Sequence, residues 1–173
     1  MAAAGMLAAV LAGVVITSPA RADDDPPFVM AHGGLFGFER PSTQTAEFGL
    51  AYRSDYKLWV LKPHFGVLGT ANGAFYGYGG LLMDVFFGNR VALTLSTAAG
   101  GWHEGDLKPP RGHPLGYPLE FRSGVDLAYR FDDRSRLGMG VYHISNAGLG
   151  KDNPGENTVE ASYALPLAKL LGQ

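Results

Sequence analysis

The chain of 173 residues contains no cysteine, so disulfide bonds and thiol chemistry are both excluded. It also lacks an excess of basic residues, because 14 Lys and Arg stand against 16 Asp and Glu, for a formal net charge of −2 at pH 7. A surface that binds nucleic acid requires a basic patch or stripe, and this balance argues against one. We therefore expect no nucleic-acid partner.

No apolar run in the chain is long enough to cross a bilayer as a helix. A short run from Met6 to Ile16 is followed by small residues and then by Ala20-Arg21-Ala22. This order is typical of a secretory signal peptide with an A-x-A cleavage site, although no Lys or Arg precedes Arg21. We predict that residues 1–22 are a cleaved signal peptide and that residues 23–173 form one domain. A soluble N-terminal helix is the alternative.

Helical periodicity is also missing, since no helical pattern longer than two turns follows residue 27. The chain is instead rich in Gly, Tyr and Phe, and its apolar residues alternate with polar ones between turn signals such as Gly88-Asn89. Short turns and longer loops follow one another in alternation, as they do in bacterial outer-membrane barrels. The pattern predicts strands at about 28–37, 44–53, 58–68, 74–87, 90–100, 119–131, 135–145 and 157–167.

Each predicted strand has two different faces. From 119 to 131 the odd positions are mostly apolar or aromatic, whereas the even ones include Glu120, Arg122, Asp126 and Arg130. A soluble, lipocalin-like barrel would show the same alternation with the apolar face inside. Small residues on the charged faces, aromatic residues near strand ends and the export signal favour the opposite sense. We predict an all-β fold, an eight-stranded antiparallel transmembrane β-barrel in the bacterial outer membrane.

The charged faces would then meet inside a narrow barrel, where charges must be paired. The candidates for ion pairs are Glu47, Asp84, Glu120, Asp126 and Glu160 with Arg53, Lys62, Arg122, Arg130 and Arg136. An eight-stranded barrel is filled by its own side chains, so we expect no pore.

The segment from Tyr142 to Thr158, YHISNAGLGKDNPGENT, is unusually polar for this chain. His143 and Ser145 share the parity of Leu137, Met139 and Val141, which predicts that they lie on the lipid-facing wall. The two residues are about 7 Å apart along a strand, at roughly 3.3 Å per residue. A Ser hydroxyl activated by a His is the minimal nucleophile for covalent catalysis, although polar interfacial residues beside a turn would produce the same pattern.

The sequence resembles the outer-membrane lipid A 3-O-deacylase (PagL) family at His143-Ile144-Ser145-Asn146-Ala147-Gly148-Leu149 and at Asn153-Pro154-Gly155. The stretch Leu115-Gly116-Tyr117-Pro118-Leu119-Glu120-Phe121-Arg122-Ser123-Gly124 is also similar. The resemblance implies an eight-stranded barrel that hydrolyses the ester-linked acyl chain at the 3 position of lipid A. It implies that Ser145 is the nucleophile and His143 the general base, and that Asn146 and the backbone N–H near Gly148 form the oxyanion hole.

The third catalytic residue does not match the family pattern. The family places a Glu fourteen residues after the His, and this sequence has Asn157 there, with Glu156 one position earlier. A register shift would bring Glu156 beside the His, Asn157 could orient the imidazole through its side-chain oxygen, or the triad could be degraded. We favour Glu156 slightly, because a carboxylate also stabilises the imidazolium.

The resemblance implies lipid A, or lipopolysaccharide, as substrate and no cofactor. His103, His113, Glu104 and Asp106 lack the spacing of metal ligands, so we expect no metal site. A non-catalytic structural or lipid-binding barrel is the alternative function, and an esterase or phospholipase on the same barrel is a third. Whether the chain forms a homodimer stays open.

Overall fold

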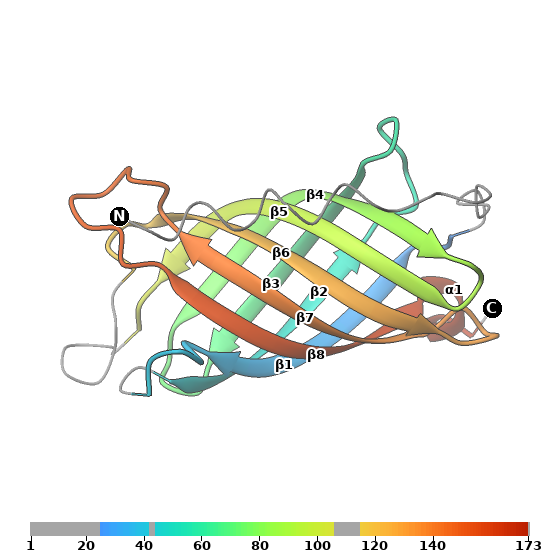
Figure 1. Cartoon of the computed structure of the whole chain (residues 1–173), viewed down its shortest axis with the longest axis horizontal. Helices are drawn as coiled ribbons and strands as arrows, with labels where there is room; N and C mark the ends of the chain where they lie inside the picture. The colour runs from blue at the N-terminus through green and yellow to red at the C-terminus, as the bar shows by residue number, and fades with distance from the viewer. Residues whose placement is uncertain (1–24, 42–43, 106–114, 173) are drawn as a thin grey trace.

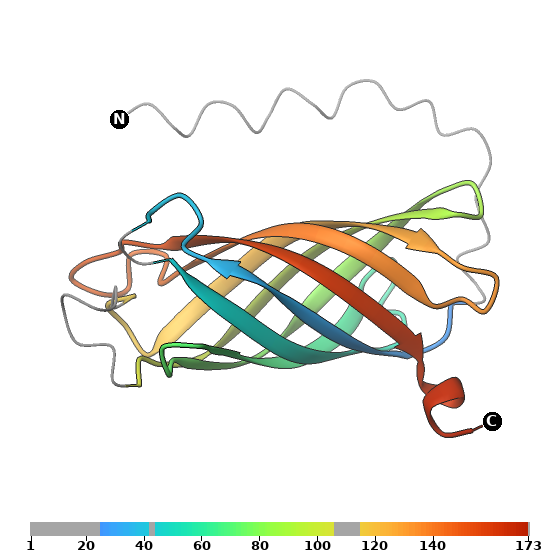
Figure 2. The same cartoon turned by 90° about the horizontal axis from the view of Figure 1, so that it is seen from below.

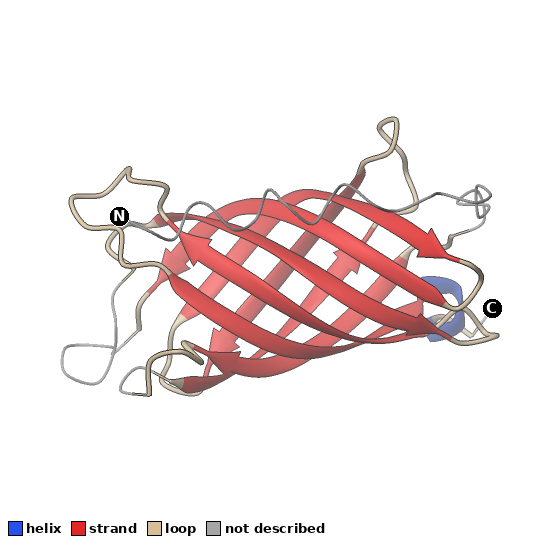
Figure 3. Cartoon of the chain, viewed as in Figure 1, coloured by secondary structure: helices blue, strands red, loops and turns tan. Residues whose placement is uncertain are grey.

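The structure is a computed structural model that describes residues 25–41, 44–105 and 115–172 (Figure 1). Eight antiparallel strands form a closed barrel, in which each strand pairs with its neighbours in sequence and β1 pairs with β8. The strands are β1 (Phe28–Phe36), β2 (Thr45–Arg53), β3 (Lys62–Thr70), β4 (Phe75–Phe87), β5 (Val91–His103), β6 (Leu119–Arg130), β7 (Arg136–Ser145) and β8 (Glu156–Pro166). The short helix α1 (Leu167–Leu170) follows β8 at one end of the barrel (Figures 2 and 3). The predicted eight-stranded antiparallel barrel is confirmed.

The predicted third strand began too early. β3 begins at Lys62, because Leu58 and Leu61 form backbone hydrogen bonds with each other, at 2.7 and 3.1 Å, across a tight turn. Trp59 lies in this turn with a φ of 64° and is not part of β3. The apolar character of the segment suggested a strand, whereas the left-handed backbone at Trp59 reverses the chain.

The outer wall of the barrel is apolar, as expected for a membrane barrel. Along β7 the exposed residues Leu137, Met139 and Val141 alternate with buried Gly138 and Gly140. Other large exposed apolar residues of the strands include Phe48, Leu50, Phe65, Val67, Val125, Leu127 and Tyr129. The apolar residues therefore face outward, which excludes the lipocalin-like alternative.

The interior near the end that carries α1 is held by paired charges. Arg136 and Lys62 both bind Asp25 and Asp84; the Lys62 Nζ atom lies 2.9 Å from a carboxylate oxygen of each. All four side chains are almost completely buried. Each charge thus has two partners of opposite sign, the arrangement that makes charge burial tolerable. Asp25 is an additional member that strand patterning did not predict.

Further ion pairs fill the rest of the barrel. Arg122 binds Glu160, and His32 Nδ1 lies 3.0 Å from the same carboxylate. Arg53 Nη2 lies 3.6 Å from Asp126 Oδ1. Of the other predicted partners, Glu47 and Glu120 are buried but form no salt bridge with the described residues, and Arg130 lies over the ring of Phe86.

Tyr142 determines which way β7 faces near its loop end. Its ring lies against the backbone of Gly124, where a Cβ atom would come within 2.1 Å of the ring, so only Gly fits opposite it. The Arg122 guanidinium lies 3.6 Å from the centre of the same ring. Because Tyr142 fills the interior, its neighbour His143 must point outward.

Some predictions concern parts of the chain outside the described residues. These are the signal peptide at residues 1–22, and Asp106 and His113 in the segment after β5. Within the described ranges, none of the helices combines the length and the apolar character needed to cross a membrane.

The buried charge cluster leads to a stability prediction. Arg136→Met should lower the free energy of unfolding by about 3–5 kcal/mol, because it leaves Asp25 and Asp84 with Lys62 as their shared cation. Urea unfolding of the protein in detergent micelles measures this loss. As a control, Arg90→Met removes the exposed pair with Asp132 and should change stability by less than about 1 kcal/mol. Equal effects of the two substitutions would contradict the prediction.

Candidate active site

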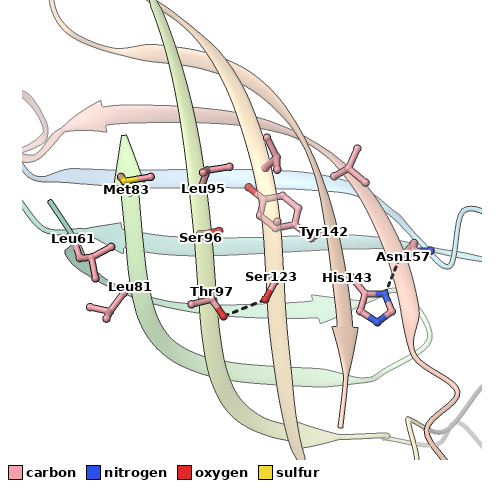
Figure 4. Close-up of a pocket in the computed structure, with 13 residues that line it drawn as sticks. Leu61, Leu81, Met83, Leu95, Ser96, Thr97, Ser123, Tyr142, His143 and Asn157 are labelled. Atoms are coloured by element: carbon pink, nitrogen blue, oxygen red, sulfur yellow. Dashed lines mark hydrogen bonds between the residues drawn. The ribbon is translucent and has the colours of Figure 1, made fainter. Parts of the chain in front are cut away.

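His143 lies exposed on the outer wall of the barrel, near the loop end of β7, and the predicted outward direction is confirmed. Its strand neighbour across the β7–β8 ladder is Asn157. The imidazole Nδ1 lies 2.8 Å from Asn157 Oδ1, as Figure 4 shows. An amide oxygen only accepts, so Nδ1 carries the proton in this contact and Nε2 is left with its lone pair. In the neutral ring, Nε2 is then the nitrogen that can accept a proton.

Glu156 does not contact the imidazole in the way that we favoured. It pairs in register with the buried Ile144, and its own side chain is buried on the interior side of β8. Arg40 Nη1 lies 3.0 Å from Glu156 Oε1. No register shift occurs, so the prediction that Glu156 lies beside His143 is wrong. Asn157 occupies that place, because alternate residues of a strand point to opposite faces.

Ser145 is the last residue of β7 and shares the outward parity of His143, but it is half-buried. Between the described side chains of Ser145 and His143 the structure shows no hydrogen bond; the imidazole bonds to Asn157. The separation follows from the strand period, which places residues i and i+2 about 7 Å apart. Catalytic contacts are often long without substrate, so this geometry is compatible with a Ser-His dyad.

Asn146 is fully buried and supports the loop that follows β7. Its Nδ2 group donates to the carbonyl oxygens of Leu115 and Asp152, at 2.9 and 2.8 Å, and its Oδ1 accepts from the Gly148 N–H at 2.9 Å. The backbone N–H of Asn146 donates to Asn153 Oδ1. The donors that we expected to form an oxyanion hole are therefore engaged within the loop, and their assignment to that role stays a prediction.

Sequence reasoning missed a polar row that crosses the apolar wall at the height of His143. In the strand register Thr97 pairs with Ser123, Ser123 with His143, and His143 with Asn157. The hydroxyl oxygens of Thr97 and Ser123 are 3.1 Å apart (Figure 4). The sequence signal that could have revealed this row is a residue with a hydroxyl group at an outward position in each of two adjacent strands, Thr97 and Ser123. Ser123 is thus a second serine near the imidazole.

An apolar groove of about 690 Å³ on the outer wall lies beside this polar row. Figure 4 shows Leu61, Leu81, Met83 and Leu95 in its lining, together with His143 and Asn157. Val125 and Val141 also line it. Such a surface can hold an extended hydrocarbon chain with its polar end near the imidazole.

Gly155 supports the imidazole from the side of the loop. Its φ is +56°, and a Cβ atom there would come within 2.9 Å of His143 Cε1 and 3.2 Å of Nε2. A residue with a side chain at this position would both adopt a disfavoured backbone conformation and displace the ring.

Fold and site together define a membrane-embedded β-barrel with a His-centred site on its lipid-facing wall. The family model for "Lipid A 3-O-deacylase (PagL)" matches residues 28–166, and the chain belongs to this family of outer-membrane ester hydrolases. A solved structure described as the outer membrane enzyme PagL is 22% identical, with a TM-score of 0.58, and the match covers 80% of this chain and 99% of that one. At this identity the structural likeness shows the fold alone. No curated protein matches the sequence.

The contact with Gly155 leads to a structural prediction. Gly155→Ala should push the imidazole away and lengthen the distance from His143 Nδ1 to Asn157 Oδ1 beyond 3.5 Å, as a crystal structure of the variant would show. Gly88→Ala is the matched control, because Gly88 has a φ of +63° but open space around a Cβ atom. Both variants should lose about 1 kcal/mol of stability from backbone strain. An unmoved imidazole in Gly155→Ala would contradict the prediction.

Proposed function

We propose that the protein hydrolyses the ester-linked acyl chain at the 3 position of lipid A in the outer leaflet. Ser145 is the nucleophile, His143 the general base and Asn157 the residue that orients the imidazole. The observation that carries this proposal is the His143–Asn157 pair on the outer wall, beside a groove lined by apolar side chains. Family membership supports the choice of substrate.

The reaction follows the usual course of a serine esterase. The Ser145 oxygen attacks the acyl carbonyl carbon while its proton passes to His143 Nε2, which forms a tetrahedral oxyanion. The imidazolium then protonates the departing 3-oxygen of the sugar, and the acyl chain remains as an ester on Ser145. Water, deprotonated by Nε2, attacks this ester; the bond from the acyl carbon to the Ser145 oxygen breaks, the imidazolium returns its proton to that oxygen, and the fatty acid leaves. Asn157 Oδ1 accepts the Nδ1–H bond throughout and keeps the ring in the reactive tautomer.

A site on the outer wall suits a lipid substrate. The polar row from Thr97 to Asn157 lies near the loop end of the strands, where the membrane interface is expected. An acyl chain that lies along the groove would place its ester near His143 without leaving the membrane. Polar side chains on a lipid-facing wall are costly, which is why a catalytic use explains them better than a structural one.

Ser145 must approach His143 Nε2 when substrate binds, because no hydrogen bond joins these two described side chains beforehand. Ser145 ends β7, and the loop from 146 to 155 follows it directly. A small rotation at this junction would bring the hydroxyl toward the ring. The same rearrangement would be needed to free the Asn146 side chain or the Gly148 N–H for the oxyanion.

The nucleophile assignment predicts that Ser145→Ala lowers deacylation by at least about 10³-fold. Mass spectrometry of lipid A from an outer membrane that contains the protein measures the loss of one hydroxyacyl chain. Ser54→Ala, in a turn at the opposite end of the barrel, is the control and should retain full activity.

Ser123→Ala tests whether Ser123, and not Ser145, is the nucleophile. It should retain activity within about tenfold, because Ser123 lines the groove but is not the proposed nucleophile. A dead Ser123→Ala beside an active Ser145→Ala would reverse the assignment. If the wild-type chain leaves lipid A unchanged, the non-catalytic barrel is the correct interpretation, and release of phospholipid acyl chains alone would indicate a phospholipase.

If Asn157 orients the His143 imidazole, substitutions of Asn157 and of its neighbour Glu156 should have different effects. Asn157→Ala removes the acceptor of the Nδ1–H bond and should lower kcat by about 10–10²-fold. Glu156→Ala removes the partner of Arg40 on the interior side and should lower thermal stability while kcat falls by less than about threefold. Steady-state kinetics on lipid A in detergent micelles measures both. Equal losses of kcat in the two variants would contradict the role of Asn157.

A further inference from the structure

The hydrogen bond from His143 continues beyond Asn157 to a carboxylate. Asn157 Nδ2 donates to Glu39 Oε2 at 2.9 Å, while Asn157 Oδ1 accepts from His143 Nδ1 at 2.8 Å. Glu39 lies in the connection between β1 and β2, far from β8 in sequence. The three side chains form a line from an exposed carboxylate, through an amide, to the imidazole.

An amide beside a catalytic imidazole has two orientations with opposite consequences. With Oδ1 toward the ring, Nδ1 is protonated and Nε2 is a base; with Nδ2 toward the ring, Nδ1 must accept and Nε2 holds the proton. Replacing the carboxylate of a Ser-His-Asp triad by Asn lowers kcat by about 10⁴, because the amide selects the wrong tautomer. An Asn in this position therefore requires something that fixes its orientation.

A carboxylate on the far side of the amide does this. Ionised Glu39 is only an acceptor, so it bonds to Nδ2 and repels Oδ1. Reversing the amide would place two oxygens against each other at the Glu39 end and lose the contact at 2.9 Å. Hydrogen bonds to a charged group are roughly twice as strong as neutral ones, which is sufficient to select one orientation by about tenfold.

The connection that carries Glu39 is itself held against β8. The backbone N–H groups of Gly37 and Phe38 donate to the Asn157 carbonyl oxygen at 3.0 and 3.3 Å. Arg40 donates to the carbonyl oxygens of Pro154 and Gly155, at 3.1 and 3.0 Å. Residues on both sides of Glu39 thus contact the segment that contains Asn157. β1 and β8 lie side by side in Figure 1, which brings this connection to the active site.

We infer that Glu39 is a positioning residue that locks the Asn157 amide, so that its oxygen faces His143 and Nε2 is the base. This inference rests on the proposed function for its effect on catalysis, although the contact itself does not. Asn157 stands where the family pattern has a Glu, and the carboxylate of Glu39 comes instead from the β1–β2 connection. It bonds to the Asn157 amide and not directly to the imidazole.

The kinetic test uses Glu39→Ala and Glu39→Gln in the full chain, with lipid A in detergent micelles. Glu39→Ala should lower kcat by about tenfold with KM changed by less than about twofold, because the acceptor is lost. Glu39→Gln should lie between it and the wild type, since its amide can still accept from Nδ2 but can also donate to Oδ1. Glu104→Gln, at the same end of the barrel, is the control and should leave kcat unchanged.

A double substitution distinguishes an amide lock from a general effect on the loop. In an Asn157→Asp background both side-chain oxygens accept from the ring, so no lock is needed and the two carboxylates repel. Glu39→Ala should then leave kcat unchanged or raise it, the reverse of its effect beside Asn157. A tenfold loss in both backgrounds would show that Glu39 only supports the loop, and would overturn the inference.

Nitrogen-15 NMR of the His143 imidazole gives a readout that does not require activity. The wild type should show the tautomer with the proton on Nδ1, and Glu39→Ala should show a mixture with the proton on Nε2. Unchanged ring signals in Glu39→Ala would overturn the inference whatever the activity. If lipid A is not deacylated but the tautomer shifts as expected, the proposed function fails and the lock stands.

Discussion

The interior of this barrel is narrow, and what fills it decides what faces the lipid. A strand sends alternate residues to opposite faces, so every side chain placed inside sends its neighbours outside. Tyr142 illustrates this, because its ring lies over Gly124 and beneath the Arg122 guanidinium. Because Tyr142 points into the barrel, the next residue, His143, must point to the outer wall. Glu156 and Asn157 follow the same rule, since the Glu156 carboxylate is buried on the interior side and the Asn157 amide meets the imidazole outside.

The paired charges of the interior make this arrangement rigid. Arg136 and Lys62 share Asp25 and Asp84, and Arg122 binds Glu160. Shifting β6 by one residue would turn its buried charges Glu120, Arg122 and Asp126 toward lipid. The register that these pairs maintain also aligns Ser123, His143 and Asn157 in one row across three strands. The alignment of this polar row is thus a consequence of packing on the opposite face of the same sheet.

The side chains of the polar row on the outer wall form hydrogen bonds with one another and with Glu39. Thr97 bonds to Ser123, and His143 bonds to Asn157, which bonds to Glu39. Groups that would be costly when exposed singly to hydrocarbon become tolerable in such pairs. The loop after β7 is similar, because Asn146 satisfies its own amide with the carbonyl oxygens of Leu115 and Asp152 and with the Gly148 N–H. A substrate must exchange some of these contacts for its own.

Alternation and turn signals were sufficient to predict the barrel and seven of its strand starts to within a residue, because these depend on local period alone. The outward direction of His143 also required the sense of the barrel, which the small residues on the charged faces, the aromatic residues near strand ends and the export signal indicated. The early start assigned to β3 shows the limit, since the turn at Trp59 depends on a backbone conformation that apolar composition does not reveal. The sequence also narrowed the third catalytic residue to Glu156 or Asn157. Only the tertiary structure decided which of them lies against the imidazole, which is Asn157, and brought Glu39 to that amide. The choice depends on how β7, β8 and the β1–β2 connection meet, and such contacts between distant segments have no signature in local sequence.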